Sequence, residues 1–161
     1  MLVGIMSDSH GDAPAVKRAF ALLDGLGAEA FFHCGDVGGQ CVLDEFVGRR
    51  IWFVWGNSDW AAPGTNVFLK TAGLPIPQVP MLVTLAGKTI AMCHGHERAF
   101  VKLSHRPDYD YVFSGHTHRP SDVRAGHCRL INPGALNGVD DPTVATLDLE
   151  RDLLDFRYLE G

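Results

Sequence analysis

LVGIMSDSHGDAPAVKRAFALLDGLG, residues 2–27, contains an apolar run, a polar turn and an amphipathic segment in direct succession. The run Leu2–Met6 predicts a buried strand, and the apolar residues after the turn recur at helical spacing. Asp12 is a suitable N-cap for this helix, and Gly25 or Gly27 is a suitable stop. A buried strand followed at once by a packed helix indicates an α/β fold.

The same arrangement of an apolar run and a polar or glycine-containing turn recurs along the chain. A second, shorter helix is predicted over Gln40–Val47, so the first third has the order β-α-β-α-β, which predicts parallel strands covered by helices. Ligands of such sheets bind beyond the carboxyl ends of the strands, where the turns lie. The runs and turns are Leu2–Met6 with SDSHG, Ala30–Cys34 with GD, Ile51–Trp55 with GNSD, Thr89–Cys93 with HGH, Tyr111–Phe113 with SGHTH, and Leu130–Ile131 with NPG.

The second half has the pattern of β-hairpins. They predict an antiparallel sheet packed against the first, and therefore a two-sheet β-sandwich flanked by helices within a single domain, residues 1–161. Residues 60–80, rich in Ala, Pro and Gly, are expected to form a long loop. The predicted hairpins pair Met81–Leu85 with Thr89–Cys93, Asp122–Arg124 with Cys128–Ile131, and Thr143–Leu149 with Leu153–Leu159.

Composition limits the classes of partner. A chain of 161 residues with 46% hydrophobic residues can bury a core of ordinary size. A net charge of -5 with scattered basic residues argues against binding to long nucleic acids. No apolar stretch approaches the roughly 20 residues of a membrane span, and the first residues lack a signal-peptide pattern. We therefore expect a cytoplasmic protein with no membrane partner and with its four cysteines reduced.

The polar turns bring together carboxylate, amide and imidazole groups that suit metal ions. Leaving them together without a charged partner would cost several kcal/mol in desolvation and repulsion. Mixed carboxylate and imidazole ligands favour Mn²⁺, Fe²⁺, Zn²⁺ or Ni²⁺ over Ca²⁺ or Mg²⁺, and the groups outnumber the needs of one ion. We expect two ions about 3.5–4 Å apart, bridged by an aspartate and a shared hydroxide. The predicted ligands are Asp8, His10, Asp36, Asn57, His94, His116 and His118.

These motifs are similar to those of a known family, the calcineurin-like metallophosphoesterases, and in particular to its small YfcE-type phosphodiesterase branch. The resemblance covers nearly the whole chain, and five ordered motifs are far more specific than any one of them. The motifs that carry it are DSH at residues 8–10, GD at 35–36, GNSD at 56–59, HGH at 94–96 and GHTH at 115–118, with NPG at 132–134.

The resemblance implies a two-metal phosphoesterase that hydrolyses small phosphodiesters by attack of the metal-bridging hydroxide. Mn²⁺ is the first expectation, with Ni²⁺, Zn²⁺, Fe²⁺ or Mg²⁺ as alternatives, and the substrate is a small phosphate ester, nucleotides included. A homo-oligomer is implied by the family alone. Asn57 and His96 are the implied phosphate contacts, and Asn57, His94 and His96 the implied catalytic residues. The implied ligand sets are Asp8, His10, Asp36 and His118 for one ion, and Asp36, Asn57, His94 and His116 for the other.

One position departs from the family pattern. Many members carry histidine after the asparagine of the third motif, as proton donor to the leaving group, and this chain has Ser58. General acid catalysis contributes about 10²- to 10⁴-fold, so good leaving groups should be preferred. Asp59, which elsewhere would orient that histidine, is expected to hold the loop, and His96 is a candidate substitute donor.

Two other classes of function stay open. A eukaryotic retromer subunit resembles this family yet is a protein-interaction scaffold with a degraded metal site, so the fold alone does not establish catalysis. A nuclease acting on small nucleotides is the other alternative. Among the remaining residues, His33 is expected to be a hydrogen-bonded core residue. Trp52, Trp55 and Trp60 are candidates to border a substrate cleft, although the opposite strand parity of Trp52 and Trp55 places at least one in the core.

Overall fold

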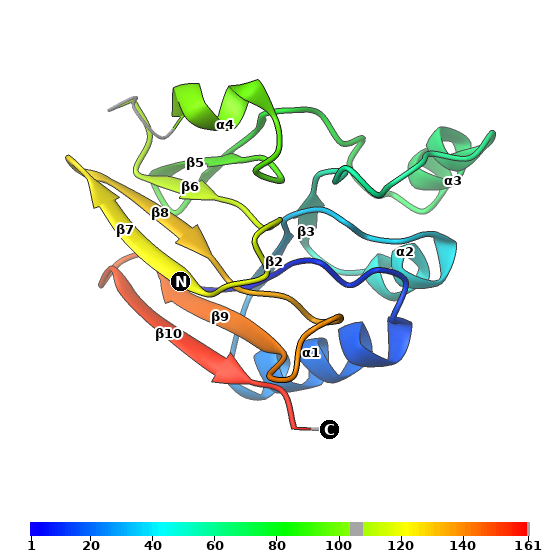
Figure 1. Cartoon of the computed structure of the whole chain (residues 1–161), viewed down its shortest axis with the longest axis horizontal. Coiled ribbons are helices and arrows are strands. Elements are labelled where there is room, and N and C mark those ends of the chain that lie inside the picture. The colour runs from blue at the N-terminus through cyan, green and yellow to red at the C-terminus, as the bar shows by residue number, and fades with distance from the viewer. Residues whose placement is uncertain (104–107, 161) are drawn as a thin grey trace.

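The computed structural model describes residues 1–103 and 108–160 and has two stacked five-stranded sheets (Figure 1). The first sheet consists of β1 (Leu2–Met6), β2 (Ala30–His33), β3 (Ile51–Phe53), β9 (Thr143–Asp148) and β10 (Leu153–Tyr158), in the order β10-β9-β1-β2-β3. The second consists of β4 (Met81–Leu85), β5 (Lys88–Met92), β6 (Tyr111–Phe113), β7 (Ser121–Ala125) and β8 (Cys128–Asn132), in the order β4-β5-β6-β8-β7. The helices are α1 (Ala13–Gly25), α2 (Gln40–Phe46), α3 (Thr65–Thr71) and α4 (Arg98–Leu103).

The opening strand and helix form as their sequence predicts. The Asp12 side chain accepts a hydrogen bond of 2.9 Å from the Ala15 N–H and so caps α1. Gly4 lets the helix lie close to β1, because a Cβ at this position would come within 2.7 Å of a methyl group of Leu23. The polar turn between β1 and α1 is therefore held between two elements that pack tightly.

Three apolar layers hold the sandwich together. On β2, Phe31 packs with α1 and α2 on the outer face of the first sheet, while its neighbour Phe32 packs between the two sheets. On β6, Phe113 belongs to the layer between the sheets, whereas Val112 packs toward α4 on the outer face of the second. Figure 1 shows α4 on the opposite side of the sandwich from α1 and α2. The predicted two-sheet sandwich flanked by helices is confirmed.

Two details of the predicted topology are wrong. The C-terminal hairpin β9–β10 joins the first sheet, where Gly4 of β1 pairs with Thr146 of β9 in an antiparallel register. The second sheet is mixed and not antiparallel, because β5 pairs with β6 and β6 with β8 in parallel. The helix α4 makes the crossover from β5 to β6. This parallel arrangement places the carboxyl ends of β5 and β6 at one edge. In addition, α3 lies within the region predicted as a loop, residues 60–80.

The three tryptophans occupy different environments. Trp52 stacks on Phe32 with a centroid distance of 5.4 Å and packs against the layer between the sheets. Trp55 makes an edge-to-face contact with Phe53 and packs against the helical side. Trp60 is 87% exposed. The opposite parity of Trp52 and Trp55 is confirmed, and Trp60 lies outside both layers.

No helix in the described part of the chain is long and apolar enough to cross a membrane.

A cluster of charged side chains joins the two sheets where the hairpin β7–β8 and the turn between β9 and β10 meet the start of β6. Asp152, in the turn between β9 and β10, accepts hydrogen bonds from Arg129 at 2.7 Å and from the Tyr111 hydroxyl at 3.1 Å, and also pairs with Arg124. Burial alone would raise the pKa of Asp152, but the bonds from Arg124, Arg129 and Tyr111 outweigh it and hold that pKa at about 2. Asp122 forms a bidentate pair with Arg129 at 2.8 Å.

The depressed pKa of Asp152 predicts how stability responds to acid. A carboxyl whose pKa is lower in the folded than in the unfolded state stabilises the fold above the unfolded pKa, about 3.9, and loses that contribution as the pH falls toward about 2. We expect Asp152→Asn to lower the urea midpoint at neutral pH and the difference from wild type to shrink between about pH 4 and pH 2. Asp155→Asn, which changes an exposed carboxylate on β10, is the control. A difference that does not depend on pH would contradict this prediction.

Candidate metal centre

The turns after β1 and β2 lie against each other at the carboxyl edge of the first sheet. The Asp8 N–H donates to the Gly35 carbonyl at 3.0 Å, and the His10 N–H donates to the Asp36 carbonyl at 2.9 Å. These bonds continue the parallel pairing of the two strands beyond their ends. The side chains of Asp8, His10 and Asp36 are consequently presented together, as the recurring strand-turn pattern predicts.

The second sheet contributes the turns after β5 and β6. The Gly115 N–H donates to the His94 carbonyl at 2.8 Å, so these two turns are also joined by backbone pairing. The His116 N–H then donates to Oδ2 of Asp8 at 3.1 Å, across the interface between the sheets. This bond fixes the histidine-rich turn of one sheet against a carboxylate of the other.

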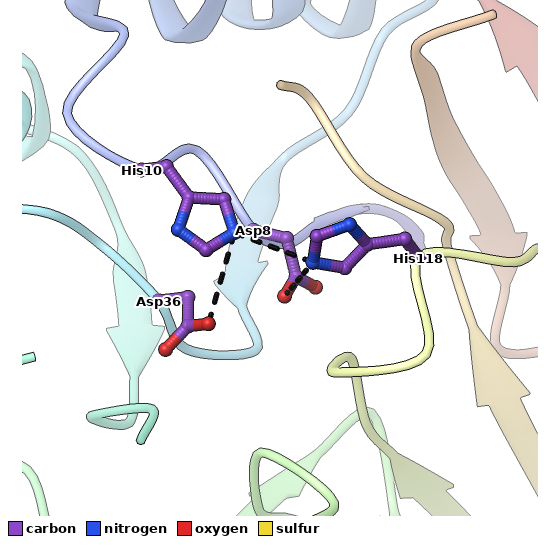
Figure 2. A group of neighbouring side chains, drawn as sticks. All are labelled: Asp8, His10, Asp36 and His118. Atoms are coloured by element: carbon purple, nitrogen blue, oxygen red, sulfur yellow. Dashed lines mark hydrogen bonds and ion pairs between the residues drawn. The ribbon is translucent and has the colours of Figure 1, made fainter. Parts of the chain in front are cut away.

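Four of the predicted ligands form a compact cluster. The ligand atoms of Asp8, His10, Asp36 and His118 all lie within 4.8 Å of one another, and Figure 2 shows their side chains directed toward a common point. Nε2 of His118 lies 3.1 Å from Oδ1 of Asp8 and 3.3 Å from Nε2 of His10. Nε2 of His10 lies 3.7 Å from Oδ2 of Asp36. Two carboxylates and two imidazoles at these separations form a set of donors for a divalent cation.

His94 extends the cluster on the other side of Asp36. Its Nδ1 lies 2.8 Å from the Cys34 carbonyl, which can only accept, so the neutral ring carries its proton on Nδ1. Nε2 then presents a lone pair, and it lies 3.4 Å from Oδ2 of Asp36 and 3.9 Å from Oδ1 of Asp8. A metal cation held between this lone pair and the two carboxylates would satisfy all three groups.

The buried atoms at this point lack hydrogen-bond partners. Within the described residues, Oδ1 of Asp8 and Nε2 of His94 are fully buried and form no hydrogen bond, and the 3.1 Å approach of Nε2 of His118 to Oδ1 of Asp8 is an ion pair only when that ring is protonated. Native proteins pair almost all buried polar atoms, so each unpaired one needs an explanation. A bound metal ion supplies it for both atoms at once. The residues present therefore fit the metal-binding group that the motifs predict.

Asp36 is held as an anion by the neighbouring loop. Its Oδ1 accepts a hydrogen bond of 2.9 Å from the Ser58 N–H. Burial alone would raise the pKa of Asp36, but the hydrogen bonds from Ser58 and the proximity of His94 and His10 outweigh burial and lower that pKa. Asp36 is thus deprotonated over the neutral pH range, which is the state required of a metal ligand.

The backbone of the cluster is strained. Five of the predicted ligands are non-glycine residues with positive φ, a conformation that is uncommon outside turns and functional sites. Glycines beside them allow close approach: a Cβ on Gly56 would overlap the Asp36 carboxylate, and one on Gly115 would overlap the Ser7 side chain. The strained ligands are Asp8 (φ 55°), His10 (46°), Asp36 (52°), His116 (70°) and His118 (59°).

The remaining predicted residues lie at the rim of the cluster. Asn57 is exposed on the turn between Gly56, which adjoins the Asp36 carboxylate, and Ser58, which donates to it. The His116 ring is 5.1 Å from that of His94, between centroids. The His96 ring is 5.4 Å from His94 and 6.0 Å from His116. All three of these rim residues, Asn57, His96 and His116, are exposed.

Three side chains support the turns that carry the ligands. Asp59 accepts from the backbone N–H groups of Val37, Gly38 and Gly56, at 3.0, 2.8 and 2.7 Å, which confirms that it holds the loop. Asn132 donates to the Gly115 carbonyl at 2.7 Å and so places the NPG motif beside the centre. The third supporting side chain is Glu97, whose role was not predicted from the sequence.

Glu97 fixes the turn that precedes α4. Its two carboxylate oxygens accept from the N–H groups of His94 at 2.9 Å and of Gly95 at 2.7 Å. Its position three residues after His94, at the start of a short helix, is a signal that resembles a capping box. The same residue lies 3.7 Å from the His96 ring, between Oε2 and Nδ1.

His33 is a core residue, as predicted. Burial lowers its pKa to about 3, so the ring is neutral. Nδ1 accepts from the Gly35 N–H at 3.4 Å, which leaves the proton on Nε2 to donate to the Ser9 hydroxyl at 2.8 Å. That hydroxyl donates in turn to the Val37 carbonyl at 3.0 Å. This chain of hydrogen bonds connects the turns after β1 and β2 on their buried side.

Comparison with known proteins agrees with this geometry. The model of the calcineurin-like phosphoesterase superfamily domain matches residues 1–152. A phosphodiesterase of Methanocaldococcus jannaschii is 29% identical over 159 residues, which cover 94% of this chain and 95% of that protein. The solved structure of an archaeal phosphodiesterase superposes with a TM-score of 0.88 at 27% identity, covering 99% of this chain and all of the other.

More distant structures share the fold alone. The phosphoesterase YfcE of E. coli superposes with a TM-score of 0.71 at 22% identity, and a zinc complex of Vps29 from Entamoeba histolytica with 0.69 at 18%. Each comparison covers 99% of this chain and all of the other. The fold is therefore common to proteins described as phosphoesterases and to Vps29.

The unpaired ligand atoms predict that divalent metal stabilises the fold. A ligand that binds only the native state adds about 2.7 kcal/mol when its concentration is 100 times Kd. We expect Mn²⁺ or Zn²⁺ to raise the Tm of metal-stripped wild type, and His118→Ala to lose most of this increase. Each variant is compared with its own metal-free Tm, so any change in basal stability cancels.

His127→Ala is the matched control for that measurement, because His127 is an exposed histidine in the turn between β7 and β8. It should keep the full metal-dependent increase in Tm. An equal increase in wild type and His118→Ala would contradict the assignment of His118 as a ligand.

Proposed function

Because this chain belongs to the calcineurin-like phosphoesterase superfamily, we propose that it is a metal-dependent phosphodiesterase acting on small phosphate esters. The single observation that supports this most strongly is the pair of buried, unbonded ligand atoms, Oδ1 of Asp8 and Nε2 of His94, at the meeting point of both sheets. The phosphodiesterase of M. jannaschii, which aligns along nearly the whole chain, supports the type of ester.

The arrangement of side chains supports two adjacent ions. One would be held by Asp8, His10, Asp36 and His118, and the other by Asp36, Asn57, His94 and His116. Oδ2 of Asp36 lies 3.7 Å from Nε2 of His10 in the first set and 3.4 Å from Nε2 of His94 in the second. This position between two groups of imidazoles supports Asp36 as the shared ligand.

Two bound divalent ions would supply positive charge for the phosphate oxygens and a water made more acidic for attack at phosphorus. The chain's own residues determine how the ester is oriented. Asn57 is exposed beside Asp36, and its amide offers an oxygen for coordination and an NH₂ group for an anionic oxygen. His96, on the other rim, is a second group that could bind phosphate or donate a proton to the leaving oxygen.

Ser58 limits the range of leaving groups. The position that carries a proton-donating histidine in many relatives here contributes a backbone N–H to Asp36. Unless His96 donates the proton, the leaving group departs as an anion, which favours acidic alcohols such as phenols. We propose that esters with good leaving groups are the better substrates.

A scaffold that binds metal without turnover is the alternative function. A zinc complex of Vps29 has the same fold, so neither the fold nor metal uptake decides between the two. The preference for Mn²⁺, a nucleotide as substrate, the homo-oligomer and the cytoplasmic location stay predictions. Turnover measurements distinguish the enzyme from the scaffold.

We expect metal-stripped protein to hydrolyse bis(p-nitrophenyl) phosphate after addition of Mn²⁺, Ni²⁺, Zn²⁺ or Mg²⁺, faster than the monoester p-nitrophenyl phosphate. Asp36→Asn should lower kcat/KM by at least about 10³-fold, because the ions contribute several kcal/mol and each 1.36 kcal/mol is tenfold. Asp24→Asn, which changes an exposed carboxylate paired with Arg49, is the control and should keep wild-type activity. Tight metal uptake without turnover for any ester would favour the scaffold.

The role of His96 is tested with a series of aryl phosphodiesters whose phenols differ in pKa. If His96 donates the proton, His96→Ala should reduce kcat by about 10²-fold or more for the poorest leaving group and much less for the best. His127→Ala should follow the wild-type dependence throughout. A loss that is uniform across the series would instead indicate that His96 contacts phosphate.

A further inference from the structure

A cavity lies beside the candidate metal centre and is lined by α2 and by parts of the loops after β2 and β3, which also carry Asp36 and Asn57. Its volume is about 190 Å³. Ser58 belongs both to this cavity and to the centre, because it lines the cavity and its N–H donates to Asp36. A group in the cavity is therefore close enough to be part of the same ligand as a phosphate at the centre.

Two aromatic side chains line the cavity, and they differ in burial. Trp55 is partly buried and held by its edge-to-face contact with Phe53 at 5.3 Å, so it forms a fixed wall. Leu43, buried on α2, lines the cavity as well. Trp60 also lines the cavity and is 87% exposed, so most of its indole surface is available to a ligand.

The charge of the lining limits what can enter. Asp59 is the acidic residue among the described lining residues, and none of them is Lys, Arg or His. The Asp59 carboxylate already accepts three backbone hydrogen bonds. A second phosphate would find no cation here, whereas an uncharged aromatic ring would find two indole surfaces.

The volume indicates the size of the group. Pockets that enclose drug-sized ligands are about 300–1,000 Å³, so a cavity of 190 Å³ accepts one substituent and not a whole dinucleotide. We infer that this cavity binds one uncharged aromatic substituent of the phosphodiester, between Trp55 and Trp60. This inference rests on the proposed phosphodiesterase function and adds the substrate class to it.

The test measures binding and does not depend on turnover. Isothermal titration calorimetry of the Mn²⁺-loaded protein compares methyl phosphate, phenyl phosphate and thymidine 5′-monophosphate, at a pH where all three are dianions. Wild type should bind at least one ring-bearing phosphate about 5- to 10-fold more tightly than methyl phosphate, because contacts between the ligand's ring and the two indole side chains add to the affinity. Phenyl phosphate carries its ring on the ester oxygen and thymidine monophosphate carries it beyond a sugar, so the preferred ligand identifies the source of the ring.

Trp60→Ala should remove this preference and leave the affinity for methyl phosphate unchanged, while Trp60→Phe should retain most of it. Tyr158→Ala, which removes an exposed aromatic residue of β10, is the matched control. Equal affinities for the three phosphates in wild type, or a preference that survives Trp60→Ala, would overturn the inference.

The two proposals can fail separately. Turnover of bis(p-nitrophenyl) phosphate without a preference for ring-bearing phosphates would overturn the aromatic cavity and leave the phosphodiesterase standing. A preference that Trp60→Ala abolishes, in a protein that hydrolyses no diester, would overturn the enzyme and leave the cavity as a binding site.

Discussion

The two carboxylates of Asp8 and Asp36 face the lone pair of a buried imidazole, that of His94. These three groups repel one another, and the rest of the centre depends on how their repulsion is relieved. The Cys34 carbonyl fixes a ring proton of His94 on Nδ1, so Nε2 of the neutral ring presents its lone pair to Asp36 and Asp8. Nε2 and Oδ1 of Asp8 are buried and form no hydrogen bond. A divalent cation would satisfy all three groups together.

The fold tolerates this arrangement because the polar groups are fixed before any ion arrives. Backbone pairing continues from β1 and β2 into their turns, and a separate pairing joins the turns after β5 and β6. Asp59, Glu97 and Asn132 then hold the loops by accepting from or donating to backbone groups. The positive φ of five ligands is a strain that only such an over-determined surrounding can maintain. Preorganisation of this kind places the ligands without a further loss of chain entropy on binding.

Much of this could be predicted from the sequence, for physical reasons that concern particular residues. Asp12 is recognisable as an N-cap from its own chemistry, and Asp8 and Asp36 follow apolar runs whose parallel pairing brings their ends to one edge. The sheet to which β9 and β10 belong could not be predicted, because a hairpin pattern specifies its internal partner and says nothing of the strand beside it. The support from Glu97 is local and its spacing from His94 is a signal that could have been used. The cavity beside Trp55 and Trp60 depends on contacts between segments that the sequence does not order in space.

The proposed metal ligands differ from one another in burial, whereas the proposed substrate contacts are all exposed. Asp8, Asp36 and His94 are buried and belong to the packing of both sheets, so their loss affects the fold as well as metal binding. Asn57, His96 and Trp60, which are the proposed substrate contacts, are exposed. Surface substitutions of this kind have small effects on stability. A member of this fold can therefore lose its substrate contacts while keeping its sandwich and its metal, so a complete metal centre does not by itself establish an enzyme.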